Sequence, residues 1–78
     1  MKKMIIVYTA EGCPWCKKVR EFLKDNNASY KERDVGKDVK AAKEMVRKSG
    51  HMGVPVIDIN GEIIIGFDEE KLKEALKL

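Results

Sequence analysis

The stretch IIVYTAEGCPWC, residues 5–16, decides the fold of this 78-residue chain. It opens with the β-branched run Ile5-Ile6-Val7, which is typical of a strand buried on both faces. A loop over 10–12 follows, and Pro14 suits the first position of a helix, where its missing N–H costs nothing. The pattern predicts a strand over 4–9 and a helix that begins after Cys13, with Cys16 in its first turn.

The rest of the chain predicts five more elements, over 29–35, 37–49, 56–59, 62–65 and from 68 onward. The strand over 29–35 is polar and should be partly exposed. Asn60-Gly61 is a strong hairpin signal, Gly50 suits the left-handed position after a helix, and Asp68 can cap the last helix. The order β-α-β-α-β-β-α predicts an α/β fold with a four-stranded mixed sheet.

Each expected helix has an apolar stripe that should face the sheet. The stripe of the first helix is Cys16, Val19, Phe22 and Leu23. That of the second is Val39, Ala42, Met45 and Val46, and that of the third is Leu72, Ala75 and Leu76.

Size and composition exclude several classes of protein. The 78 residues suffice for one domain, 1–78, and not for a two-domain enzyme. Two cysteines are too few for a disulfide-stapled scaffold, and a zinc finger would need a second ligand pair where the chain offers only His51. The net charge is +3, with bases and acids interleaved, so we expect no nucleic-acid partner.

The longest apolar run near the start, residues 4–8, is too short for a signal peptide or a membrane span. We therefore expect a cytoplasmic monomer without a membrane partner. In that compartment a cysteine pair tends to be catalytic, redox-sensing or metal-bound rather than structural.

The cysteine spacing has a direct chemical meaning. Cys13 falls at the N-cap of the first helix and Cys16 at N3. N–H groups of the first turn and the helix dipole both favour a thiolate at the N-cap, so the pKa of Cys13 should lie below the free value of about 8.5. Lys17 and Lys18 add positive charge nearby. We expect Cys13 to attack a substrate disulfide and Cys16 to resolve the mixed disulfide.

The cysteine pair allows other interpretations. Two cysteines three apart can be a buried pair, half of a zinc site or incidental, but here they follow a buried strand, open a helix and carry Pro14 between them. The alternative function is a non-enzymatic metal or iron–sulfur binding module that uses Cys13 in a dimer, because two thiolates cannot complete a four-ligand site. The intact pair and Pro14 argue against it, and no metal site is expected.

Four residues outside the pair also bear on the site. Pro55 opens a strand, where a trans bond is the ordinary case and a cis bond would free the backbone of Val54 to pair with a bound peptide or thiol. Trp15 at N2 should point outward as a docking surface rather than into the core. Phe67 either staples the last helix or walls the thiol site. His51 is expected to be a solvated loop residue.

The chain resembles the glutaredoxin branch of the thioredoxin superfamily. The matching segments are Tyr8-Thr9, Cys13-Pro14-Trp15-Cys16, Gly53-Val54-Pro55 and Gly66-Phe67-Asp68. The resemblance covers essentially the whole chain and implies the thioredoxin-like (glutaredoxin) fold, a cis Pro55 and dithiol chemistry through Cys13 and Cys16. It also implies that Pro14, Trp15, Val54, Pro55, Gly66, Phe67 and Asp68 form the substrate- and thiol-binding surface.

The resemblance further implies disulfide-containing protein substrates, with ribonucleotide reductase or a peroxidase as candidates, and no tightly bound cofactor. The electron donor is either glutathione, as a co-substrate, or thioredoxin reductase. Ala10 replaces the lysine that glutathione-using members commonly carry, and the acids 68–70 crowd the helix start where a glutathione carboxylate would sit. Gly66-Phe67 is more similar to the small redoxins recharged by thioredoxin reductase, whereas Cys-Pro-Trp-Cys is more similar to glutaredoxin.

Overall fold

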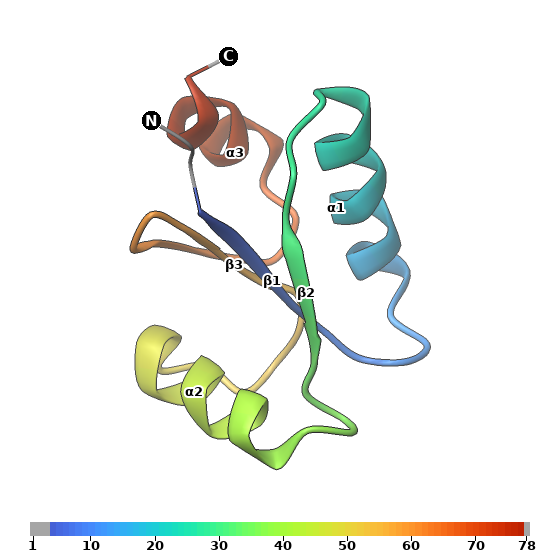
Figure 1. The fold of residues 1–78 in the computed structure, drawn as a ribbon, viewed down its shortest axis with the longest axis vertical. Helices are drawn as coiled ribbons and strands as arrows, with labels where there is room; N and C mark the ends of the chain where they lie inside the picture. The colour runs from blue at the N-terminus through green and yellow to red at the C-terminus, as the bar shows by residue number, and fades with distance from the viewer. Residues whose placement is uncertain (1–3, 78) are drawn as a thin grey trace.

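A four-stranded mixed sheet forms the middle layer of the structure, a computed structural model that describes residues 4–77 (Figure 1). Its strands are β1 Ile5–Thr9, β2 Lys31–Asp34, β3 Val56–Ile59 and β4 Glu62–Ile65, in the spatial order β2-β1-β3-β4. β1 runs parallel to β2 and antiparallel to β3, which is antiparallel to β4. The predicted α/β class and mixed sheet are confirmed, and β1, with its β-branched run, is an inner strand covered on both faces.

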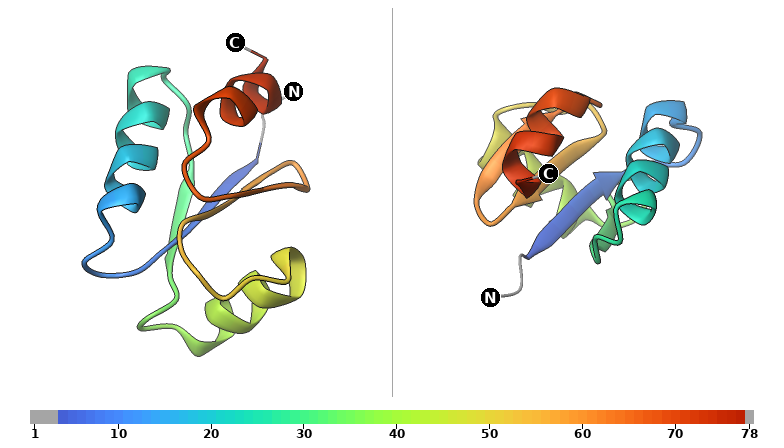
Figure 2. Two further views of the ribbon diagram at one scale, coloured as in Figure 1. Left: turned by 180° about the vertical axis from the view of Figure 1, so that it is seen from behind. Right: turned by 90° about the horizontal axis from the view of Figure 1, so that it is seen from above.

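Three helices cover the two faces of this sheet (Figure 1 and Figure 2). α1 Pro14–Asp25 and α3 Glu69–Leu76 lie on one face, and α2 Val39–Ser49 lies on the other. Within residues 4–77, no helix is long and apolar enough to cross a membrane. The fold is thus a three-layer sandwich, with the cysteine pair at the start of α1.

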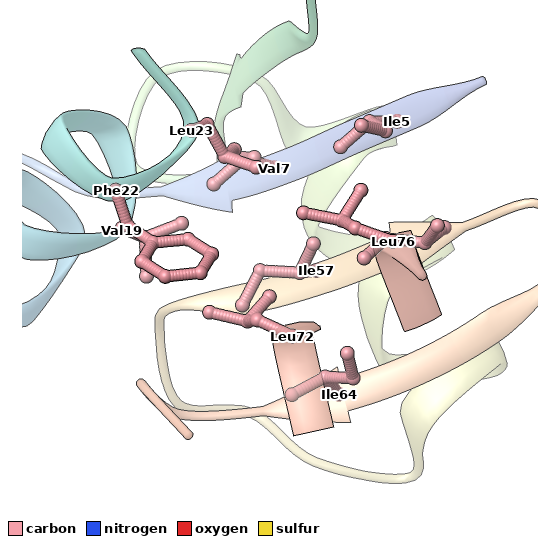
Figure 3. Packing of buried hydrophobic residues seen from close by; sticks show 10 residues of the cluster. Ile5, Val7, Val19, Phe22, Leu23, Ile57, Ile64, Leu72 and Leu76 are labelled. Carbon is pink, nitrogen blue, oxygen red and sulfur yellow. The ribbon is translucent and has the colours of Figure 1, made fainter. Parts of the chain in front are cut away.

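The face under α1 and α3 carries the larger apolar core (Figure 3). Its buried members are Ile5, Val7, Val19, Phe22, Leu23, Ile57, Ile59, Ile64, Leu72 and Leu76. The predicted stripes of these two helices are confirmed, with Ala75 partly buried beside the cluster. Burial of one such side chain contributes about 1.5–3 kcal/mol, so this core holds α1 and α3 against the sheet.

Local signals set the ends of the elements. Asp38 caps α2 with its carboxylate, which accepts the N–H groups of Lys40 and Ala41, so that helix begins at Val39 rather than at residue 37. Asn60 and Gly61 both have positive φ, 53° and 94°, as a type I′ hairpin requires. The second strand is shorter than the predicted 29–35.

The predicted stripe of α2 is confirmed at Met45 and wrong at Val39 and Val46. Ala41 and Met45 are the buried residues of α2, whereas Val39 is 69% exposed and Val46 is 38% exposed. The physical reason is that α2 turns two charged side chains, Glu44 and Lys48, toward polar groups of the sheet. Satisfying those buried groups outweighs the burial of two valines.

A polar network joins α2 to the sheet. The hydroxyl of Tyr8, a fully buried residue of β1, donates to Glu44 Oε2 (2.8 Å) and accepts from Lys48 Nζ (2.9 Å). Lys48 also donates to Asp58 Oδ2 (2.8 Å), and Arg33 Nη1 donates to Glu44 Oε2 (2.6 Å). Burial raises the pKa of Tyr8, and the hydrogen bond to Asp58 raises the pKa of Lys48. The network therefore holds a neutral phenol and a charged ammonium side by side.

Candidate active site

The cysteine pair occupies the first turn of α1 as predicted. Cys13 is the N-cap, Pro14 is N1 and Cys16 is N3, and Cys13 Sγ accepts the N–H of Cys16 at 3.1 Å. The first turn of an α-helix has N–H groups without intrahelical partners, so this sulfur takes one of them. The same contact, together with the helix dipole, stabilises negative charge on Cys13 once the thiol is free.

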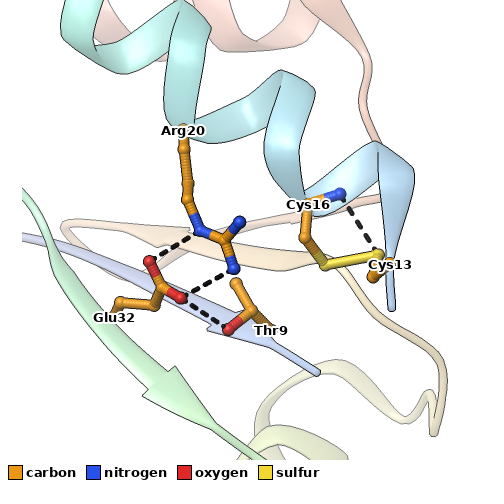
Figure 4. The surroundings of a disulfide bond; sticks show 5 residues. All are labelled: Thr9, Cys13, Cys16, Arg20 and Glu32. Carbon is orange, nitrogen blue, oxygen red and sulfur yellow. Dashed lines mark hydrogen bonds and ion pairs between the residues drawn. A yellow bond between two sulfur atoms is a disulfide. The ribbon is translucent and has the colours of Figure 1, made fainter. Parts of the chain in front are cut away.

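The two sulfurs are joined in a disulfide and differ in exposure (Figure 4). Their Cα atoms lie 5.3 Å apart, within the ordinary range for a disulfide. Cys16 is completely buried, whereas Cys13 is partly exposed. An incoming thiolate therefore reaches Cys13, and Cys16 is shielded on the inner side of the helix.

A hydrogen-bonded group of three residues lies beside the disulfide at the end of β1 (Figure 4). Thr9 is 1% exposed and its hydroxyl donates to Glu32 Oε2 at 3.0 Å. Arg20 of α1 donates two hydrogen bonds of 2.8 Å to the same carboxylate. The bond from Arg20 lowers the pKa of Glu32, so the carboxylate stays ionised. The sequence does not predict this group, because its members lie on β1, β2 and α1 and come together only in the folded chain.

An aromatic surface flanks the disulfide on the solvent side. Trp15 is 54% exposed, as predicted, and stacks on Phe67 with ring centroids 6.3 Å apart. Phe67 also meets Phe22 of the core edge-on at 6.1 Å. Lys18 lies over the Trp15 ring, 5.8 Å from its centroid. Phe67 thus packs on the core and supports the exposed indole of Trp15, and its expected roles as a staple of the last helix or a wall of the thiol site stay predictions.

A small cavity of about 190 Å³ adjoins this aromatic surface. It is lined by Lys18, Glu21, Phe22, Asp25 and Phe67. The lining combines two aromatic rings with charges of both signs, which suits an amphipathic side chain of a docked polypeptide.

The segment before β3 supplies a second edge of the candidate site. The Val54–Pro55 peptide bond is cis, as the resemblance implies, and Pro55 is buried while Val54 is half-buried. The N–H of Gly66 donates to the Pro55 carbonyl at 2.9 Å, which ties the end of β4 to this segment. Among residues 4–77, none hydrogen-bonds to the Val54 N–H or carbonyl. These two groups are available to a ligand.

Asp68 and His51 lie where their sequence positions predict. Asp68 caps α3, and its Oδ1 accepts the N–H of Lys71 at 3.2 Å, so the carboxylate is engaged within its own helix. His51 is exposed, as expected for a solvated loop residue. Over the described part of the chain, no group of three or more His, Cys, Asp or Glu side chains has the arrangement of a metal site.

Comparison with known proteins agrees with this geometry. The family model for glutaredoxin matches residues 5–64. An uncharacterized glutaredoxin-like 8.6 kDa protein in the rubredoxin operon of Clostridium pasteurianum is 40% identical over 74 residues, which cover 95% of this chain and 99% of that protein. Glutaredoxin 3 of Escherichia coli K12 is 32% identical over 63 residues, covering 81% of this chain and 76% of the relative.

Similar solved structures support the same family. The thioredoxin-like protein BC3987 superposes with a TM-score of 0.87 at 42% identity, over 91% of this chain and 97% of that one. A glutaredoxin from Archaeoglobus fulgidus superposes with a TM-score of 0.87 at 29% identity, over 95% and 86% of the two chains. With a family model over residues 5–64, a cysteine pair at the start of α1 and a thioredoxin-like sheet beneath it, this chain belongs to the glutaredoxin family.

Proposed function

We propose that the protein is a thiol–disulfide oxidoreductase in which Cys13 is the attacking residue and Cys16 the resolving residue. The observation that supports this most directly is the difference between the two sulfurs: Cys13 is partly exposed and accepts an N–H of the first turn, whereas Cys16 is buried. We expect the pKa of the reduced Cys13 to lie below the free value of about 8.5.

The cycle transfers two electrons. In the reduced protein the Cys13 thiolate attacks one sulfur of a substrate disulfide, forms a mixed disulfide and releases the other sulfur as a thiolate. Cys16 then loses its proton and attacks Cys13 Sγ, which forms the intramolecular disulfide and releases the second substrate thiol. A donor dithiol, or two molecules of glutathione, reduces that disulfide again.

The surroundings of Cys13 favour a polypeptide as substrate. The exposed Trp15 stacks on Phe67, and the free N–H and carbonyl of Val54 offer strand-like pairing to an extended chain. A half-exposed tryptophan on a rigid support is the kind of residue that dominates protein docking. We therefore propose protein disulfides as the main substrates, in the cytoplasm, as part of thiol electron transport and redox homeostasis.

Both donor classes, glutathione and thioredoxin reductase, stay open as proposals. Ala10 offers no charge to a glutathione carboxylate, and Glu69 and Glu70 are exposed in the first turn of α3. The comparison that decides is the rate at which glutathione with glutathione reductase, or NADPH with thioredoxin reductase, reduces the oxidised protein.

The proposed chemistry is tested by single substitutions of the two cysteines. Cys13→Ser should abolish reduction of an insulin-type protein disulfide and of a small aromatic disulfide, because the attacking sulfur is lost. Cys16→Ser should retain formation of the mixed disulfide and trap it, detectable by mass spectrometry. Lys24→Gln, at the far end of α1, serves as the matched control and should behave as wild type. Activity retained in Cys13→Ser would contradict the assignment.

A further inference from the structure

The outer face of α2 carries an apolar stripe that nothing in the structure covers. Val39, Ala42 and Val46 recur at helical spacing, the pattern that normally marks a buried face. Here the helix is turned so that Glu44 and Lys48 meet the sheet, and the valines face outward. An apolar helical stripe left exposed on a small protein is a mark of an interaction surface.

The stripe is part of a groove that Met52 completes. Ala42, Lys43, Val46, Arg47 and Met52 line an open groove of about 430 Å³. Met52 is 83% exposed and comes two residues before Val54, so the groove borders the loop that leads into the candidate active site. The floor is made of small and flexible apolar side chains, which suits an aliphatic anchor residue.

The charge of the molecule gathers around this groove. Residues 37–48 hold five basic and two acidic side chains, an excess of three that equals the net charge of the whole chain. Both acids, Asp38 and Glu44, are paired with Arg33, and Lys48 is paired with Asp58. Four exposed cations are left without an ion pair among the described residues: Lys37, Lys40, Lys43 and Arg47.

We propose that this groove is a docking site for an acidic, amphipathic segment of a partner protein, with an aliphatic residue in the groove and carboxylates on Lys43 and Arg47. The inference rests on the proposed function, because it names the class of protein substrate or donor that the cysteine pair serves. Complementary charge raises the association rate and fixes orientation, so the groove would present the partner's disulfide to Cys13.

Other occupants fit the groove less well. Single-stranded nucleic acid is held by stacking on aromatic rings, and the lining contains none. A second copy packed α2 against α2 would oppose two sets of unpaired cations. A membrane surface would require a wider apolar face than this one short groove provides.

The test uses two peptides that differ only in charge. Each carries, in order, a cysteine in mixed disulfide with thionitrobenzoate, a flexible Gly-Ser linker of about ten residues and a helical segment with leucines on one face. The linker spans about 18 Å on average and about 33 Å when fully extended, which exceeds the 32 Å longest extent of the molecule. One helical segment has glutamates beside the leucines, and the other has glutamines. Released thionitrobenzoate reports kcat/KM.

We expect the acidic peptide to be reduced about three- to tenfold faster than the neutral one at low salt, the combined effect of two or three exposed ion pairs. The ratio should approach one near 1 M salt, where the Debye length is about 3 Å. The double variant Lys43→Gln/Arg47→Gln should bring the ratio close to one by slowing the acidic peptide. The matched control Lys24→Gln/Lys71→Gln should keep the ratio, and Met52→Gln should slow both peptides, because the leucines of both bind against this side chain.

Equal rates for the two peptides in the wild type, or an unchanged ratio in Lys43→Gln/Arg47→Gln, would overturn the docking proposal. So would stronger competition by a short oligothymidine or by phosphatidylglycerol vesicles than by the acidic peptide without its disulfide, or a dimer in sedimentation that the double variant dissociates. If no disulfide at all is reduced, the proposed function fails instead, and fluorescence anisotropy of the labelled acidic peptide still tests the groove.

Discussion

Replacing Lys48 with methionine tests whether the polar network under α2 orients that helix. Methionine keeps most of the aliphatic chain and removes the ammonium, which donates to Asp58 Oδ2 at 2.8 Å and to the Tyr8 hydroxyl at 2.9 Å. Asp58 is 8% exposed in the wild type, so in the variant its carboxylate is left buried without a cation. It keeps one partner, the N–H of Gly61 on Oδ1 at 2.8 Å, and Tyr8 keeps its bond to Glu44.

The size of the stability loss depends on the hydrogen bonds that Asp58 and Tyr8 keep in the variant. Removing one partner of a buried ion pair costs about 3–5 kcal/mol. A value below this range applies here, because the Lys48 side chain is 26% exposed and Asp58 retains its hydrogen bond from Gly61. We expect a loss of about 2 kcal/mol in the free energy of unfolding. With an unfolding entropy of about 2.1 cal/mol/K per residue, 78 residues give about 0.16 kcal/mol/K. The melting temperature should therefore fall by about 12 °C.

The assay is urea unfolding followed by circular dichroism, with thermal melts in parallel. The double variant Lys48→Met/Asp58→Asn should recover part of the loss, since it removes the stranded charge, and the double-mutant cycle should give a coupling of about 1–2 kcal/mol. Lys40→Met on the exposed side of α2 is the matched control and should change stability by less than about 0.5 kcal/mol. A Lys48→Met protein as stable as the control would refute the reasoning.

Three further predictions concern the carboxylate of Glu32, the Tyr8–Lys48 pair and the exposed Trp15. The Arg20 hydrogen bond holds the pKa of Glu32 below its usual value, so the wild type should lose stability as pH falls through that lowered pKa. Urea titrations at pH 7 and pH 3 should show that Glu32→Gln lacks this dependence. The raised pKa values of Tyr8 and Lys48 place their stabilisation below about pH 10, and it should be lost as pH rises further, seen as alkaline unfolding. Trp15→Ala should raise KM about tenfold for a protein disulfide and leave a small aromatic disulfide nearly unaffected, as steady-state kinetics will show.

Local signals predicted most of the fold. The N-cap position of Cys13, the Asn60-Gly61 hairpin and the cap by Asp68 each depend on residues only a few positions apart, and each is confirmed. In such cases the backbone hydrogen bonds and the allowed φ values are decided within one turn. The start of α1, and hence the placement of the cysteine pair, belongs to this class.

Contacts between distant segments were not predictable in the same way. The stripe expected on α2 counted Val39 and Val46 as buried, because periodicity alone cannot reveal that Glu44 and Lys48 have partners on the sheet. Asp58 lies in the predicted strand over 56–59, and the sequence does not reveal that its side chain is buried and paired with Lys48. Such pairs come together only once β1, β3 and α2 are assembled, so a single sequence carries no local trace of them.

The two missed networks share an origin in β1, and this bears on the site. Tyr8 and Thr9 are consecutive residues of that strand, so their side chains point to opposite faces of the sheet. Tyr8 joins α2 to β1 through Glu44 and Lys48, and Thr9 joins β1 to β2 and α1 through Glu32, which Arg20 holds. The end of β1 is therefore held from both faces just before the loop that carries Cys13. Because both tethers are charge-assisted hydrogen bonds rather than apolar contacts, they fix orientation as well as distance. The disulfide at the start of α1 therefore opens and closes next to a strand end that hydrogen bonds hold from both faces of the sheet.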